Sequence, residues 1–98
     1  MAGTSRLVCG GFVETETFGK AKEDLKRLLG LTNREIDDRL EGLLWALRRD
    51  ASVVSERIPR RFLWVAVTPR GIPTLRIYLR PRGDVEGECE LLWIEERA

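Results

Sequence analysis

The stretch TLRIYLRPRG, residues 74–83, concentrates the side chains in this sequence that are best suited to bind phosphate. Arg76, Arg80 and Arg82 lie within seven positions, together with Tyr78, the only tyrosine. Because side chains alternate between the two faces of a strand, Arg76, Tyr78 and Arg80 are expected on one face. A guanidinium group binds phosphate oxygens in bidentate fashion and stays charged at ordinary pH. The stretch therefore predicts a surface for a nucleic-acid backbone, with the tyrosine stacking on a base or binding a phosphate.

Further arginines extend this predicted surface through the adjoining loops and the strand end: Arg60, Arg61, Arg70 and Arg82. The alternative is that Glu88 and Glu90 lie across a hairpin and neutralise the same arginines. Ion pairs of that kind on a surface contribute about 0–1 kcal/mol each, so they could yield to phosphate.

The distribution of charge fits both interpretations. Net charge is +1, but residues 57–82 hold seven arginines and no acid, whereas residues 84–98 hold six acids and one arginine. Such a separation is typical of a patch that faces a polyanion. It is equally typical of neighbouring strands that pair their opposite charges.

Other kinds of chemistry find little support in the composition. The chain has no histidine, which removes Ser-His and Cys-His nucleophile pairs, and no glycine-rich loop has phosphate-binding spacing. Cys9 and Cys89 are expected to be reduced core residues, with a disulfide considered only for a hyperthermophilic source. Glu95 and Glu96 are expected on opposite faces of a strand, as solvated surface. Neither a metal nor a cofactor is expected.

The hydrophobic pattern predicts one α+β domain over residues 1–98, with an antiparallel helix pair packed on an antiparallel meander of three to four strands. Gly30 is expected to end the first helix, and Thr32 with Glu35 forms a capping box at the start of the second. The expected elements are a first strand within 6–18, helices from Lys20 to Gly30 and over 31–50, a short strand at Val53–Val54, and strands over 61–67, 74–80 and 88–96.

The three tryptophans, Trp45, Trp64 and Trp93, are expected mainly in or at the edge of the core, with a partner surface as the alternative. No apolar run approaches the length of a bilayer span, and no signal peptide is recognised, so a cytoplasmic location is expected. Scarcity of amide residues and abundance of arginine indicate a thermophilic source or a GC-rich genome.

The segment FVETETFGKAKEDL resembles the start of toxins of the RelE/ParE superfamily, most closely those of the HigB-like branch. Residues that match the pattern F-V-E-T-x-x-F-x-K are Phe12, Val13, Glu14, Thr15, Phe18 and Lys20. The middle strand, Leu75 to Tyr78, is similar to L-R-V-x-Y in relatives. The order of the remaining elements also follows the family, so the resemblance covers nearly the whole chain.

The resemblance implies a toxin of a type II toxin–antitoxin system. RelE-like members cut messenger RNA in the ribosomal A site without a metal, through attack of the RNA's own 2′-hydroxyl on the adjacent phosphate. The expected partners are then a cognate antitoxin, the ribosome and mRNA, with a toxin–antitoxin heterotetramer as one assembly and no membrane. The alternative is a catalytically inactive or gyrase-directed protein with the toxin fold, which acts as a protein-interaction module.

By the same resemblance, Arg76 is expected to grip the scissile phosphate and Arg97 to match an arginine that follows the last strand. Tyr78 is the sole phenol available as a proton donor. The sequence departs from the family in three ways: it lacks lysines in RFLWVAV, has no histidine or tyrosine after the last strand, and has a net charge of only +1. These departures leave the catalytic set incomplete.

Overall fold

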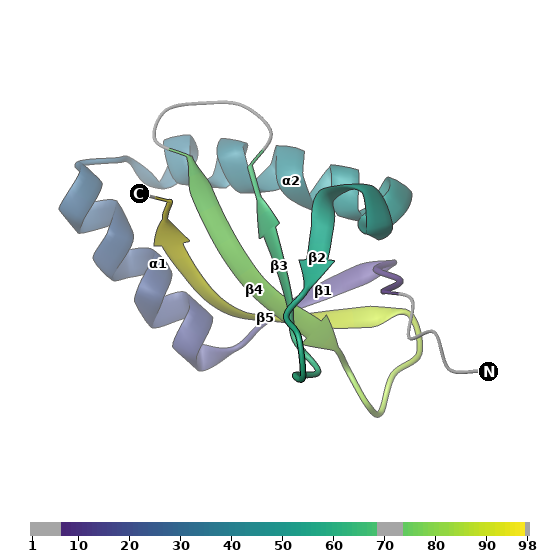
Figure 1. The fold of residues 1–98 in the computed structure, drawn as a ribbon. Coiled ribbons are helices and arrows are strands. Elements are labelled where there is room, and N and C mark those ends of the chain that lie inside the picture. Colours follow the sequence, from purple (N-terminus) through teal and green to yellow (C-terminus); the bar gives the residue numbers. More distant parts are fainter. Residues whose placement is uncertain (1–6, 69–73, 98) are drawn as a thin grey trace.

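The described residues form two helices and a five-stranded mixed sheet, which confirms the α+β class. The computed structural model describes residues 7–68 and 74–97. Its elements are β1 (Gly11–Glu14), α1 (Glu16–Leu29), α2 (Asn33–Val54), β2 (Ser55–Arg57), β3 (Trp64–Val67), β4 (Leu75–Pro81) and β5 (Glu88–Glu96). Figure 1 shows the sheet at the centre, with α1 beside β5 and α2 crossing behind the strands.

The strand order in the sheet is β1-β5-β4-β3-β2. Strands β2 to β5 form the expected antiparallel meander, with four members. Strand β1 departs from the antiparallel pattern because it pairs in parallel with β5, Val13 lying opposite Glu90. Thr15 fixes this edge of the sheet, since its backbone N–H and its hydroxyl both donate to the carbonyl of Leu91, at 3.1 and 2.8 Å.

Helix α1 begins at Glu16, four residues earlier than predicted. The reason is Thr15, whose hydroxyl accepts a hydrogen bond from the Phe18 N–H at 3.2 Å and so acts as the N-cap. Gly30 ends the helix in the left-handed conformation, with φ of 66°, as predicted. The buried side of α1 carries Phe18, Ala21 and Leu25.

The capping box of α2 is confirmed: the Glu35 N–H donates to the Thr32 hydroxyl and the Thr32 N–H donates to the Glu35 carboxylate. Asp50 interrupts the helical backbone, and its carboxylate accepts from the Ser52 N–H at 3.1 Å, so a last helical segment runs on to Val54. The strand predicted at Val53–Val54 was therefore misplaced, because this local cap prolongs the helix and β2 begins at Ser55.

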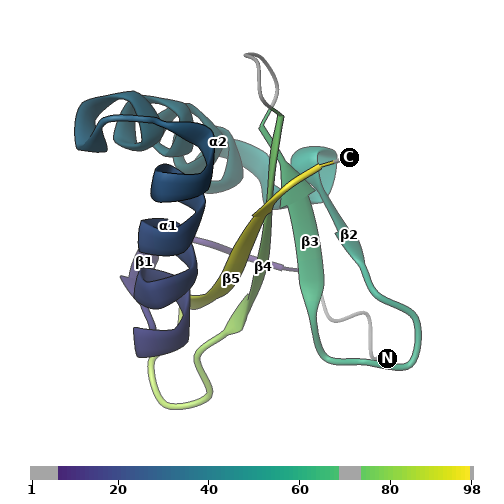
Figure 2. The ribbon, with the colours of Figure 1, turned by 90° about the vertical axis from the view of Figure 1, so that its left-hand side faces the viewer.

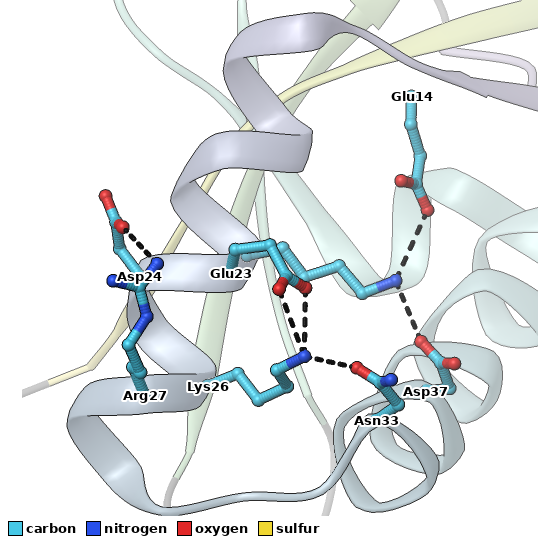
Figure 3. Close-up of polar contacts among 8 residues, drawn as sticks. Glu14, Glu23, Asp24, Lys26, Arg27, Asn33 and Asp37 are labelled. Carbon is cyan, nitrogen blue, oxygen red and sulfur yellow. Dashed lines mark hydrogen bonds and ion pairs between the residues drawn. The ribbon is translucent and has the colours of Figure 1, made fainter.

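The predicted antiparallel helix pair is wrong. Figures 1 and 2 show α1 and α2 crossing at a large angle. Each helix packs on a different part of the sheet, α1 on β5 and α2 on β2 and β3, so the short link at residues 30–32 turns the chain sharply without aligning the two axes. Lys22 links α1 to α2 and to β1, with its Nζ 2.8 Å from Asp37 and 3.6 Å from Glu14, the two carboxylates labelled in Figure 3.

The core lies between the helices and one face of the sheet. Its largest fully buried side chains come from both layers: Phe18, Ile36, Leu43, Leu47, Leu75, Ile77, Leu79, Leu91 and Ile94. Of the tryptophans, only Trp64 is buried in the core; Trp45 is 58% exposed and Trp93 is 43% exposed, so neither is a core residue. Within residues 7–68 and 74–97, neither helix combines the length and apolar character needed to cross a bilayer.

Candidate functional site

Strand β4 presents its polar side chains as the sequence predicted. Leu75, Ile77 and Leu79 are buried, whereas Arg76, Tyr78 and Arg80 alternate with them on the other face. Figure 2 shows both helices on one side of the sheet, so this second face carries no helix among the described elements. The side chains expected to contact phosphate are therefore on the open side of the sheet.

Arg76 is not a free cation. Its Nε donates to the Glu95 carboxylate at 2.8 Å, and its Nη2 contacts the same oxygen, Oε2. The Tyr78 hydroxyl donates to this oxygen at 3.2 Å, and the Trp93 indole N–H donates to the other oxygen at 3.1 Å. We call these four residues, Arg76, Tyr78, Trp93 and Glu95, the Glu95 cluster. Three side chains thus converge on one carboxylate.

A β-bulge in β5 creates this arrangement. Tyr78 pairs with Trp93 and Leu79 with Leu91, so Leu92 is the extra residue. Past the bulge, the alternation shifts by one position, and Trp93 and Glu95 come to lie on the open face with Glu90. Without the bulge, a strict alternation would place Glu90 and Glu95 on opposite faces.

The other two arginines of the stretch are also paired with acids. Arg80 Nε lies 3.0 Å from Glu90, and Arg82 lies 3.0 Å from Glu88 and 3.2 Å from Asp84. This is the neutralised arrangement that the sequence left open as an alternative for Glu88 and Glu90. Three arginines face four carboxylates here, counting Glu95, so the hairpin of β4 and β5 does not present a positive surface.

The remaining predicted residues do not form one patch with Arg76. Arg60 and Arg61 are exposed in the turn between β2 and β3, where Arg60 adopts φ of 65°. This turn and the β4–β5 turn lie at the same end of the sheet in Figure 1. Arg97 is exposed at the opposite end, next to the start of β4, where its N–H donates to the carbonyl of Thr74 at 2.8 Å. Arg70 lies outside the described residues.

The ionisation of the Glu95 cluster follows from its contacts. Hydrogen bonding by Arg76 lowers the pKa of Glu95, and partial burial offsets this effect only in part. Burial raises the pKa of Tyr78, and the negative charge of Glu95 adds to that increase. At neutral pH the cluster therefore holds a guanidinium, a carboxylate and a neutral phenol. Its net charge is zero.

An apolar groove lies beside this cluster, between α1 and the second half of β5. It has a volume of about 370 Å³ and is lined by Ala21, Asp24, Leu25, Leu28, Trp93, Ile94, Glu95 and Glu96. Leu28 is 79% exposed and lies at the edge of the apolar face of α1 that buries Ala21 and Leu25. The acids stand at the rim of the apolar surface. Two of its three acids are paired, Asp24 with Arg27 and Glu95 with Arg76, so Glu96 supplies the negative charge of the groove.

Sequence reasoning missed Glu95 as the partner of Arg76, and it did not identify Leu28 as a surface residue. The signal for Glu95 is the Leu91-Leu92 pair, which breaks the alternation of ECELLWIEE and indicates a bulge. Ala21, Leu25, Leu28 and Leu29 fall on one face of the helical pattern, which does not separate exposed Leu28 from half-buried Leu29. Their final exposure depends on how far α1 rotates on β5, which the pattern does not specify.

No group of three or more cysteine or acidic side chains in the described segments has the arrangement of a metal site. In comparisons with known proteins, no family model, no curated protein and no solved structure matches this chain. Inference about function therefore depends on the residues and their geometry.

Proposed function

We propose that this chain is a RelE/ParE-like domain that acts by binding a partner protein, with a segment of that partner in the groove between α1 and β5. The observation that carries this proposal is the pairing of Arg76, Arg80 and Arg82 with carboxylates. A phosphate-binding strand needs guanidinium groups whose charge is available to the ligand. Here each charge is compensated within the chain.

The partner is best described by the chemistry of the groove. Leu28, Trp93 and the aliphatic floor match the apolar side of an amphipathic segment. Glu96 at the rim matches a lysine or arginine at the flank of that segment, whereas Asp24 already pairs with Arg27 of the same helix. Exposed tryptophan is a frequent anchor of binding energy in such contacts. A short antitoxin with an amphipathic, basic segment fits this description, in keeping with the resemblance of FVETETFGKAKEDL to toxins.

The neighbouring reading frame in the source genome supplies a direct test. Its product is co-expressed with the chain, and the complex is isolated through a tag on one component. Co-purification is expected with the wild-type chain and with Arg76→Ala, but not with Leu28→Glu combined with Trp93→Ala. Retention of the complex by the double groove variant would contradict the proposed binding surface.

A second candidate, a metal-free mRNA endonuclease, is favoured by one specific observation: Arg76, Tyr78 and Glu95 meet at one point. In this candidate Glu95 accepts the proton of the RNA 2′-hydroxyl and Arg76 stabilises the negative charge that develops on the phosphorane. Tyr78 protonates the leaving 5′-oxygen, since its raised pKa keeps the phenol protonated. RNA would have to displace the Arg76–Glu95 hydrogen bonds.

Induction of the chain in a bacterial host separates the two candidates. An endonuclease arrests growth and leaves cuts at the ribosomal A site, and Arg76→Ala abolishes both effects while the fold remains intact. An unchanged cleavage rate in that variant would exclude the Arg76 site. Arrest with DNA damage and intact mRNA would indicate gyrase as the partner.

A further inference from the structure

Cys9 and Cys89 are 80 positions apart in the sequence but meet inside the protein. Their Sγ atoms lie 2.6 Å apart, well within the contact distance of two unbonded sulfur atoms. Both residues are buried, with exposed fractions of 2% and 0%. Adjacent hydrogen bonds from the N–H groups of Gly10 and Gly11 to the Gly87 carbonyl hold the two chain segments side by side.

We propose that Cys9 and Cys89 form an intramolecular disulfide that joins the segment before β1 to the start of β5. This proposal is independent of the partner groove and of the Glu95 cluster. Two thiols this close can be bridged without a backbone rearrangement, which is the usual geometric obstacle to a disulfide. The bridge closes a loop of 80 residues and restricts the unfolded chain, as expected for a cross-link between distant positions.

Formation of the bond requires an oxidant, for which glutathione disulfide is a suitable probe. The Cys89 thiolate attacks one sulfur of the probe and releases one glutathione thiolate, leaving a mixed disulfide. The Cys9 thiol then loses its proton to solvent and attacks the Cys89 sulfur, which releases the second glutathione. Two thiols are oxidised to one disulfide, and one glutathione disulfide is reduced to two glutathione molecules.

The assignment of roles follows from the contacts of the two sulfurs. The neighbouring Cys89 sulfur and burial raise the pKa of Cys9, whereas the hydrogen bond from Cys9 lowers the pKa of Cys89. Cys89 is therefore the first to ionise. Once Cys89 is in a mixed disulfide its negative charge is gone, so Cys9 loses its proton more readily. Access to Cys89 requires the segment around Val8, whose carbonyl lies 3.4 Å from the Cys89 sulfur, to move aside.

The test is a redox titration of the full chain in glutathione buffers, quenched with an alkylating reagent and analysed by intact-mass and peptide mass spectrometry. The expected product is a monomer that has lost two hydrogen atoms and yields a linked peptide pair containing Cys9 and Cys89. Its thermal midpoint should fall by on the order of 10 °C on addition of dithiothreitol. Cys9→Ala, which cannot form the bridge, should show no response to the reductant.

Three results would overturn the proposal. They are alkylation of both cysteines after equilibration with glutathione disulfide, cross-linking only between two chains, and an equal response of wild type and Cys9→Ala to dithiothreitol. Because core variants can fail to fold, Cys89→Ala provides a second single-thiol control, and the mass measurement on the wild-type chain needs no variant.

Discussion

Glu95 holds Arg76 across the β4–β5 pair, with Arg76 Nε 2.8 Å from its carboxylate. The same carboxylate accepts hydrogen bonds from Tyr78 and Trp93. This relationship gives one carboxylate three donors and leaves the guanidinium without a free charge for a ligand. It is the reason why the arginine-rich strand is better described as part of an internally paired surface than as a phosphate-binding one.

The pairing predicts a pH dependence of stability. Hydrogen bonding lowers the pKa of Glu95 in the folded state. Glu95 therefore contributes fully to the free energy of unfolding when the pH is above its unfolded-state pKa of about 4.3. This stabilisation is lost as the pH falls through the folded-state pKa of Glu95. Urea unfolding should therefore show wild type more stable than Glu95→Gln at neutral pH, with the difference shrinking in acid.

Glu96→Gln is the matched control for that experiment, because Glu96 is the next residue, is exposed, and takes no part in the Glu95 cluster. Its free energy of unfolding should follow that of wild type across the pH range. A difference between wild type and Glu95→Gln that stays constant with pH would contradict an ionised Glu95 in the folded state.

The groove predicts a binding defect without a folding defect. Leu28 is 79% exposed, so Leu28→Glu should change the free energy of unfolding by no more than about 0.5 kcal/mol. Its charged carboxylate would, however, lose hydration against the apolar side of the partner without gaining a compensating contact there. Calorimetric titration with the co-expressed partner should show a loss of affinity of about tenfold or more.

Val53→Glu is the corresponding control for the groove, since Val53 is 76% exposed and lies on α2, outside the groove. This variant should bind the partner as wild type does. Equal losses in the two variants would indicate a general effect of added negative charge and not a groove contact.

The distribution of large apolar residues predicts two contrasting stability effects on α2. Leu43 is fully buried, so Leu43→Ala should lower the free energy of unfolding by about 2–5 kcal/mol. Trp45 is exposed and stacks beneath Arg49 at 5.2 Å, so Trp45→Ala should cost no more than about 1 kcal/mol. Chemical denaturation of both variants checks the assignment, and a larger loss for Trp45→Ala would place that residue in the core.

Much of the fold could be predicted because local signals determine it. Thr32 with Glu35 and Gly30 mark helix ends through hydrogen bonds that involve only neighbouring residues. The alternation in residues 75–80 correctly separated buried from open positions on β4. The pairing of β1 with β5 and the crossing of the helices depend on contacts distant in sequence, so local patterns could not provide them.

The sequence predicted which side chains share the open face of β4 but not which acids pair with them. Arg76, Tyr78 and Arg80 share a face as expected, yet the partner of Arg76 is set by the bulge at Leu92. A bulge of one residue moves every later side chain of the strand to the other face. Without the position of the bulge, the cross-strand partners of all residues after it cannot be predicted. Arg97 follows the end of β5 and the Arg60–Arg61 turn precedes β3, so the antiparallel strand directions place them at opposite ends of the sheet.

The central claim is that carboxylates compensate the arginines of residues 76–82, and binding of single-stranded RNA as a function of salt tests it most directly. Wild type should bind weakly, with a shallow slope of log affinity against log salt. Replacing Glu88, Glu90 and Glu95 together by glutamine should free Arg76 and Arg80, while Asp84 still pairs with Arg82, and should steepen that slope by about 1.5 units. A wild-type slope already as steep as that of the triple variant, and reduced by Arg76→Ala, would contradict the account.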